Sequence, residues 1–310
     1  MIPGIFDFHV HIGEQIGGQQ LADDWHSYAR MAEQCGIEGI GVFVTEANGT
    51  SLADKLQHMR EAAKDYHGRV FWHLTPCNLE PRSIINLLGA DTDIKLYTTY
   101  REAGLYQSYE AIERFMTDMS SHKTRLLVHC EDDAIIADHS YRNPFFRAAD
   151  HSIRRPEKAE IVAVEKLLEL SLKHKYPLHI VHVSCPKAAL LIHQAKQEAK
   201  YITCETAPHY LLLNEEQLAD PQGHRWLCSP PLRSENSRGL MVELLQDGIF
   251  DIIASDHCAF TVLQKDSGIL HPEITPMGIA GSGTLFSLLA EHLVAKGKIS
   301  MEQLFQLISY

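Results

Sequence analysis

The chain has 310 residues, of which 45% are hydrophobic and 22% charged, and its formal net charge is −12. A chain of this size and composition can bury a large core and is ordinary for a soluble enzyme. The negative charge is spread without long runs, which argues against a nucleic-acid or anionic-membrane partner and favours a small-molecule substrate.

The sequence lacks two further kinds of feature, which bear on the cellular location and on the role of the cysteines. No stretch approaches the roughly 20 apolar residues of a membrane span, and the first residues do not form a basic segment followed by an apolar one, so we expect a cytoplasmic protein. The seven cysteines include no Cys-x-x-Cys pair, which predicts neither a disulfide framework nor a thiolate zinc site. Cys130 and Cys258 are expected to be small core residues, because strand alternation turns them away from neighbouring site residues.

The first predicted strand, residues 5–12, alternates in the sequence Ile-Phe-Asp-Phe-His-Val-His-Ile. Successive side chains of a strand point to opposite faces, so Asp7, His9 and His11 share one face and the apolar residues share the other. This pattern predicts one face that can bind a metal and one that packs in the core. Taken alone, a His-x-His pair in a chain with 19 histidines is better explained by two hydrogen-bonded histidines.

Seven more β-rich runs follow, each separated from the next by a loop and an amphipathic segment. The predicted strands span residues 5–12, 39–45, 70–75, 93–97, 125–130, 178–183, 201–206 and 251–255. The predicted helices span residues 21–34, 52–65, 82–88, 109–121, 156–174, 187–199, 237–246, 284–295 and 301–308. Eight strands alternating with helices predict an α/β fold, a (β/α)8 TIM barrel forming a single domain over residues 1–310. A doubly wound sheet is the alternative, but it would not bring five strand ends to one point.

Six potential metal ligands lie near the ends of predicted strands one, four, five, six and eight. They are His9, His11, Lys95, His129, His182 and Asp256. The active site of such a barrel lies at the carboxyl ends of its strands. Neutral imidazole suits divalent transition metals, so the first histidine pair is predicted to hold one ion and His129 with His182 a second. The set predicts a binuclear catalytic centre.

Lys95 is predicted to supply the bridge between the two ions. Its ammonium form would be repelled by cations, but burial favours the neutral amine, which can take up carbon dioxide to form an anionic carbamate with two oxygens. The alternative is a lysine that closes an ion pair inside the barrel.

Asp256 is predicted to complete the ligand set of the first ion and to face a bridging water. A water shared by two ions is acidified toward neutral pH, so hydroxide becomes available as a nucleophile. Asp256 would accept its proton and pass it to the leaving nitrogen. An N-cap or an Asx turn is the alternative role for a lone aspartate.

Six motifs occur in order along nearly the whole chain. They are Asp7-x-His9-x-His11, Lys95, Val-His129-Cys-Glu-Asp, Ile-Val-His182-Val-Ser, Ser229-Pro-Pro-Leu-Arg233 and Ser255-Asp256-His257-Cys-Ala-Phe. Together they resemble the amidohydrolase superfamily, in its cyclic-amidase branch of dihydropyrimidinase/hydantoinase, dihydroorotase and allantoinase. The resemblance implies a carboxylated lysine, two divalent metal ions and hydrolysis of a ring C–N bond by a bridging hydroxide. Zinc is the metal it implies, although cobalt or manganese would fit the same donors.

The hydantoinase type is favoured by Tyr100, five residues after Lys95, where that group carries a tyrosine that hydrogen-bonds the developing oxyanion. Ser229 lies in a motif close to that of the same group, and we expect it to contact the substrate. The group's substrate-binding asparagine is replaced near Met277 and Gly278, which are therefore candidate substrate contacts. Tyr100 could equally be a loop aromatic that covers the barrel mouth.

The dihydroorotase type is favoured by the segments 204–213 and 275–281, which look similar to that group. Dihydroorotases place an arginine two residues after the His-x-His pair, where it pairs with the substrate carboxylate, but this chain has Gly13. A histidine after the Asp-His-Ala-Pro run of that group is also replaced, by Phe260. We therefore expect a neutral cyclic ureide or imide as the substrate, unless a basic residue such as Arg101 substitutes.

Two other classes of function stay open from the sequence. A non-catalytic homologue could use the barrel as an interaction scaffold, although such relatives have typically lost metal ligands. A deaminase with a single metal is the other alternative, and metal stoichiometry would separate these possibilities.

The family's small β-sandwich is built from residues before the first barrel strand and after the last helix, whereas this chain begins at the barrel. We therefore expect the sandwich to be absent from residues 1–310. Apolar barrel surface that it would have covered is expected to favour a homo-oligomer, either a dimer or a tetramer.

Overall fold

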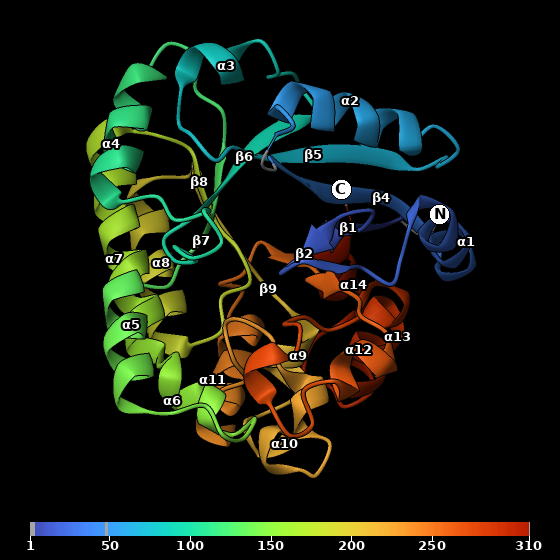
Figure 1. Cartoon of the computed structure of the whole chain (residues 1–310). Helices are drawn as coiled ribbons and strands as arrows, with labels where there is room; N and C mark the ends of the chain where they lie inside the picture. The colour runs from blue at the N-terminus through green and yellow to red at the C-terminus, as the bar shows by residue number, and fades with distance from the viewer. Residues whose placement is uncertain (1–3, 47–48, 310) are drawn as a thin grey trace.

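The computed structural model describes residues 4–46 and 49–309 and shows strands alternating with helices around a central parallel sheet (Figure 1). The sheet has nine strands in the order β10-β9-β8-β7-β6-β5-β4-β1-β11. The strands are β1 (Ile5–His11), β4 (Ile37–Thr45), β5 (Arg69–Thr75), β6 (Thr92–Tyr97), β7 (Leu126–His129), β8 (Leu178–Ile180), β9 (Ile202–Thr206), β10 (Ile252–Ile253) and β11 (His257–Cys258). All eight predicted strands are thus present, and β2 (Gln15–Ile16) and β3 (Gln19–Gln20) form a separate small hairpin.

The predicted eighth strand, residues 251–255, is present as β10, and the unpredicted β11 just after it lies at the opposite end of the sheet. β10 pairs in parallel with β9, through Ile253 and Thr206, whereas β11 pairs with β1, through His257 and Val10. Only residues 254–256 separate the two strands. The sheet therefore curls back on itself, as expected for a barrel and not for a doubly wound sheet, and Asp256 lies between the two strands.

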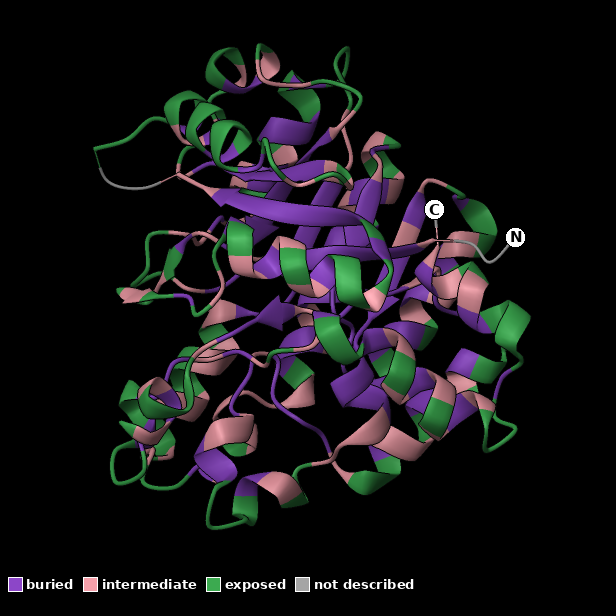
Figure 2. Ribbon diagram, turned by 90° about the vertical axis from the view of Figure 1, so that its right-hand side faces the viewer, coloured by how far each residue is buried: buried purple, intermediate pink, exposed green. Residues whose placement is uncertain are grey.

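Helices cover the outside of the curled sheet. They are α1 (Trp25–Cys35), α2 (Leu52–Ala62), α3 (Pro81–Ile85), α4 (Tyr109–Asp118), α7 (Glu157–His174), α8 (Pro186–Glu198), α11 (Glu235–Gln246), α13 (Leu285–Leu289) and α14 (Met301–Ile308). The strands are mostly buried, and the helices alternate between buried and exposed positions along their length (Figure 2). This pattern is the one expected of helices that present an apolar stripe to a sheet.

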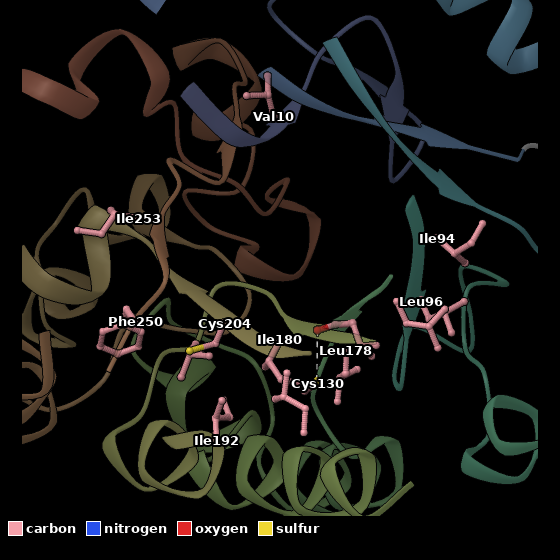
Figure 3. Packing of buried hydrophobic residues seen from close by; sticks show 14 of the residues in the cluster. Val10, Ile94, Leu96, Cys130, Leu178, Ile180, Ile192, Cys204, Phe250 and Ile253 are labelled. Atoms are coloured by element: carbon pink, nitrogen blue, oxygen red, sulfur yellow. Dashed lines mark hydrogen bonds between the residues drawn. The ribbon is translucent and has the colours of Figure 1, made fainter. Parts of the chain in front are cut away.

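Local signals in the sequence fix where helices begin and end. Asp24 caps α1 by accepting the backbone N–H of Ser27, and Gly36 ends it with φ of 69°, a value that favours glycine. In the core, Leu178 and Ile180 of β8 lie beside Ile192 of α8 (Figure 3). Apolar strand residues therefore pack against the apolar face of the covering helix.

Several short helices in the loops were not predicted. They are α5 (Asp133–Arg142), α6 (Asp150–Arg154), α9 (Pro208–Leu212), α10 (Glu216–Ala219) and α12 (Val262–Asp266). α5 has no buried residue among its ten, so it lacks the apolar periodicity that reveals a helix. The helix predicted over 284–295 is α13 followed by a π-helical turn, Ala290–Val294.

All seven cysteines are free, and Cys130 and Cys258 are buried as predicted. Among the helices of the described residues, none is long and apolar enough to cross a membrane.

Candidate active site

The six predicted ligands converge at the carboxyl ends of the strands. His9 and His11 lie on β1, Lys95 on β6 and His129 at the end of β7, while His182 and Asp256 follow β8 and β10. The side chain of Lys95 is buried, and its charge contributes to lowering the pKa of all four histidines after the larger effect of burial. Parallel strands thus bring residues from distant parts of the sequence to one point, as predicted.

The first group of donors contains His9, His11 and Asp256, whose ligand atoms lie within 4.8 Å of one another. Nε2 of His9 is 3.0 Å from Oδ1 of Asp256. Nδ1 of His11 is buried and has no hydrogen-bond partner among the described residues. A buried polar atom without a partner is costly, and a cation would satisfy it.

The second group is the pair His129 and His182, with 3.0 Å between Nδ1 of the former and Nε2 of the latter. Two unprotonated ring nitrogens at this distance repel each other unless a shared proton or a cation lies between them. Nitrogens on one tetrahedral zinc ion, with bonds of roughly 2.0–2.1 Å, are about 3.3 Å apart. The donors present therefore fit a divalent ion. Nδ1 of His182 is likewise buried without a partner among the described residues.

Two buried glutamates orient one histidine of each group. Glu205 on β9 pairs with Nδ1 of His9, while Glu131 accepts a hydrogen bond of 2.7 Å from Nε2 of His129. Each carboxylate fixes the tautomer that leaves the other ring nitrogen free to bind a metal. Neither glutamate is among the site residues predicted from the sequence. The signal for Glu131 was its position two residues after His129.

Burial favours the neutral imidazoles that metal binding requires, whereas it raises the pKa of the Asp256 carboxyl. It lowers the pKa of His9 and of His129 to about 4, and it lowers those of His11 and His182 well below the usual value. Burial also lowers the pKa of Lys95 to about 8. The imidazoles are thus neutral at neutral pH, and the free amine of Lys95 is accessible for carbamate formation.

Phe43 of β4 connects the lysine to the first histidine pair. Nζ of Lys95 lies 4.9 Å from the ring centroids of both Phe43 and Tyr97. The Phe43 ring stacks on that of His11 at 4.4 Å and lies 4.4 Å from that of His9. Lys95 therefore faces the same interior space as the histidines.

Three of the predicted site residues have left-handed backbone conformations. The φ angles are 67° at Tyr100, 39° at His182 and 52° at Asp256. Non-glycine residues adopt such angles at a cost of order 1–3 kcal/mol, and they cluster at functional sites. At the end of each strand the chain turns abruptly, which directs these side chains to the barrel mouth.

Tyr100 lies beside the second histidine pair. Its ring centroid is 5.0 Å from that of His129, and Cζ of Arg155 lies 5.1 Å from the tyrosine ring. Burial raises the pKa of Tyr100 to about 12, while Arg155 and a hydrogen bond with Ser229 lower it. The phenol is therefore protonated at neutral pH and can donate a hydrogen bond.

The other predicted substrate contacts lie in loops between β9 and α13. Ser229 lies beside His151, with 3.4 Å between its Oγ and the ring Nε2. The carbonyl of Met277 is 3.7 Å from Sγ of Cys258, and Gly278 donates its N–H to Leu227 at 2.9 Å. Met277 and Gly278 thus border the segment that carries Asp256 and are not part of the donor cluster.

Known proteins of similar sequence and structure support the same interpretation. No protein-family model matches the chain. Dihydroorotase from Bacillus cytotoxicus is 28% identical over 318 residues, and dihydroorotase from Brevibacillus brevis is 25% identical over 316; each match covers 99% of this chain and 71% of the relative. Among solved structures, dihydropyrimidinase from Brevibacillus agri superposes with a TM-score of 0.91 at 25% identity, covering 99% of this chain and 69% of the other. L-hydantoinase (dihydropyrimidinase) from Arthrobacter aurescens gives 0.87 at 25% identity, with the same coverage.

The barrel fold and the convergent histidines, lysine and aspartate are the arrangement expected of a metal-dependent barrel hydrolase. The comparisons confirm the more specific prediction, a resemblance to the cyclic-amidase branch of the amidohydrolase superfamily, over nearly the whole chain.

Proposed function

We propose that this chain hydrolyses the C–N bond of a neutral cyclic amide, in the manner of a hydantoinase or dihydropyrimidinase. Cyclic amide hydrolysis as the reaction class is supported by the relatives named above. The observation that carries the proposal is the pair of close donor contacts at one barrel mouth. One is His9 with Asp256 at 3.0 Å, and the other is His129 with His182 at 3.0 Å.

Two divalent ions, zinc by default, would be held by these residues. His9, His11 and Asp256 suit one ion, His129 and His182 suit the second, and carboxylated Lys95 would bridge them. When bound, such ions acidify water and polarise a carbonyl group. The two ring nitrogens without partners and the neutral imidazoles support this assignment.

The residues of the chain would perform the remaining steps. Water oxygen bonds to the ring carbonyl carbon, and Asp256 accepts the proton that the water loses. Tyr100 donates a hydrogen bond to the carbonyl oxygen as negative charge develops on it. Asp256 then transfers its proton to the ring nitrogen as the C–N bond breaks. Ser229, Met277 and Gly278 would contact the ring.

A neutral ring is favoured because the arginines near the mouth already have partners. Nε of Arg101 is 2.9 Å from Oδ2 of Asp133, and its Cζ lies 3.7 Å from the Tyr106 ring centroid. Arg155 pairs with the buried Glu131. Both guanidinium groups already have anionic partners, so neither is an evident replacement for the arginine whose position Gly13 occupies.

Dihydroorotase is the second candidate, because the two sequence relatives described above bear that name. Allantoinase is a further possibility within the same branch. Metal content per chain on protein purified with bicarbonate, followed by hydrolysis assays with dihydrouracil, hydantoin, dihydroorotate and allantoin, tests all of these. We expect about two metal ions and turnover of a neutral ring. One ion per chain together with deamination activity would favour a single-metal deaminase. Metal-free, inactive protein would favour a non-catalytic scaffold.

Residues 1–310 are proposed to act as one (β/α)8 barrel domain, in the cytoplasm and as a homo-oligomer. Support for self-association comes from exposed apolar side chains, such as Leu263 and Leu270, which are 83% and 81% exposed. Light scattering of the purified protein would test it, since a monomer at all concentrations would refute the oligomer.

A further inference from the structure

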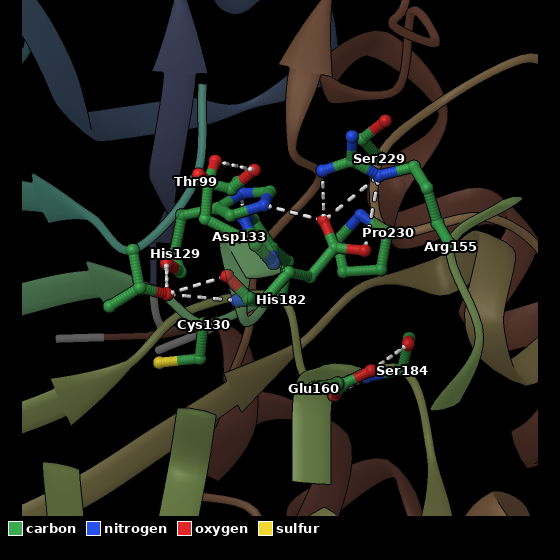
Figure 4. A network of polar contacts seen from close by, with 12 residues as sticks. Thr99, His129, Cys130, Asp133, Arg155, Glu160, His182, Ser184, Ser229 and Pro230 are labelled. Atoms are coloured by element: carbon green, nitrogen blue, oxygen red, sulfur yellow. Dashed lines mark hydrogen bonds and ion pairs between the residues drawn. The ribbon is translucent and has the colours of Figure 1, made fainter. Parts of the chain in front are cut away.

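Arg155 is a buried arginine that the proposed reaction does not use. It follows α6 directly, and its side chain is 11% exposed. Its Nε lies 3.1 Å from each carboxylate oxygen of Glu131, and its Nη2 also donates to Oε2. Figure 4 shows Arg155 extending toward the side of the site that holds His129. A planar guanidinium that binds both oxygens fixes the orientation of a carboxylate as well as its charge.

The contacts of Glu131 carry this orientation to a predicted metal ligand. Both oxygens of Glu131 accept from Nε of Arg155 at 3.1 Å, the geometry of an ion pair between a guanidinium and an ionised carboxylate. An ionised carboxylate only accepts hydrogen bonds, and therefore the proton of the His129 ring resides on Nε2. The unprotonated Nδ1 then faces His182.

The same guanidinium also packs against Tyr100. Its Cζ lies 5.1 Å from the centre of the tyrosine ring, and that ring in turn contacts the His129 ring at 5.0 Å between centroids. Arg155 is itself held in place, because its carbonyl accepts a hydrogen bond of 2.6 Å from Arg233. One side chain thus contacts both the supporting carboxylate of His129 and the predicted oxyanion donor.

We propose that Arg155 is a positioning residue that sets the ligand tautomer of His129 through Glu131 and holds the Tyr100 ring against the same histidine. This inference rests on the proposed function, since it assigns a role toward the ion held by His129 and His182. It predicts that the two metal positions respond unequally when Arg155 is changed. In the first group, His9 is oriented by Glu205 instead. Glu205 also contacts Nε2 of His179 at 3.2 Å and the backbone N–H of His182 at 3.3 Å.

Cobalt titration of the metal-free protein, followed by visible absorption, tests the role of Arg155 independently of turnover. For Arg155→Met we expect the affinity for the second ion to fall by about 10- to 100-fold, as for other residues that support metal ligands, with the first ion little affected. Glu131→Gln should lose the same affinity, and the double variant should lose no more than either alone, because both changes break one chain of contacts. Arg155→Lys retains the charge but not the two-pronged geometry, so it should recover only part of the loss.

Arg125→Met is the matched control. Arg125 also binds both oxygens of a buried carboxylate, that of Asp93, at 3.2 and 2.7 Å, but this pair lies at the start of β7, away from the carboxyl end that carries the site. Its loss should lower the melting temperature without selectively weakening the second ion. If Arg155→Met does not fold, Arg155→Lys and Glu131→Gln still decide the question.

The outcomes separate this inference from the function on which it rests. Wild-type protein that binds no cobalt would refute the proposed function. Wild-type protein that binds two ions, together with Arg155 and Glu131 variants of unchanged affinity for both, would refute only the role of Arg155. Equal weakening of both ions in Arg155→Met, matched by Arg125→Met, would also refute it, because that pattern reports general destabilisation.

Discussion

A buried lysine is the residue that most sharply distinguishes the proposed centre from a cluster of structural histidines. Lys95 is 1% exposed and lies among four neutral imidazoles. As an ammonium group it would be stabilised by the carboxylates of Glu205 and Asp256. A carbamate would instead be the anion that two cations require, so the chemical state of this one side chain tests the proposed site.

Lys95→Ala is expected to abolish metal retention and turnover together. Turnover should fall by about a thousandfold or more, because the ions supply several kcal/mol of transition-state stabilisation. Metal analysis of dialysed protein and ¹³C NMR after growth with labelled bicarbonate would check both parts. Lys64→Ala is the control, since Lys64 is 62% exposed and pairs with Glu61 at the end of α2. A fully active Lys95→Ala enzyme would rule out the carbamate bridge.

Glu14 is expected to make the stability of the fold depend on pH. It is 3% exposed, and burial raises its pKa from 4.5 to about 7, even though it accepts hydrogen bonds from the backbone and side chain of Thr45. The folded state therefore binds the Glu14 proton more tightly than the unfolded state does. This contribution is fully present below pH 4.5 and is lost as the pH rises through about 7.

Glu14→Gln removes that titration and should make the variant relatively more stable as the pH rises. The difference in unfolding free energy between variant and wild type should shift by about 3 kcal/mol across this range, since one pKa unit corresponds to roughly 1.4 kcal/mol. Urea denaturation of both proteins at several pH values would measure it. A difference that stays constant from pH 4.5 to 7.5 would contradict the raised pKa, with the range set by the value of about 7.

At the scale of elements, the sequence was sufficient to predict the strands but not the helices in the loops. Alternation in residues 5–12 and seven further β-rich runs predicted all eight strand positions, because strands are rich in β-branched and aromatic residues. α5 could not be found in the same way, since it buries no residue. The separate strand β11 was also missed, because it depends on which neighbour the chain meets after the sheet has curled.

Gly278 lies in the segment beside β11, and its lack of a side chain lets the two segments pack closely. Its φ is 151°, and a Cβ there would lie 2.5 Å from the carbonyl oxygen of Cys258 in β11. Gly278→Ala is therefore expected to displace β11 or to destabilise the fold by about 1–3 kcal/mol. Chemical denaturation would measure the effect.

Gly239→Ala provides the opposite control. Gly239 lies inside α11, and nothing stands within 4 Å of the position that its Cβ would occupy. Alanine there should stabilise the protein by about 0.5–1 kcal/mol. If the two substitutions had the same sign, the close approach of Gly278 to β11 would not be a constraint on the fold.

At the scale of the whole molecule, the convergence of the six ligands followed from the sequence because parallel strands end on one face of a barrel. The residues that support these predicted ligands could not be predicted from the sequence in the same way. Glu205, Arg155 and Phe43 come from elements whose side-chain directions are set only when the sheet closes. Their hydrogen bonds and ring contacts depend on distances that no spacing in the sequence specifies.

The net charge of the chain acts on every substrate that approaches the barrel, so salt dependence tests whether the substrate is neutral or anionic. The chain carries a formal charge of −12, so an anionic ring such as dihydroorotate is repelled on approach, whereas dihydrouracil and hydantoin are not. We expect kcat/KM for a neutral ring to stay nearly constant from about 0.01 M to about 1 M salt, over which the screening length falls from about 30 Å to about 3 Å. For dihydroorotate, any turnover should increase with salt as the repulsion is screened. A kcat/KM for dihydroorotate that decreases with salt would instead require an attractive cationic group at the mouth, and it would move the assignment from a neutral-ring amidase to a dihydroorotase.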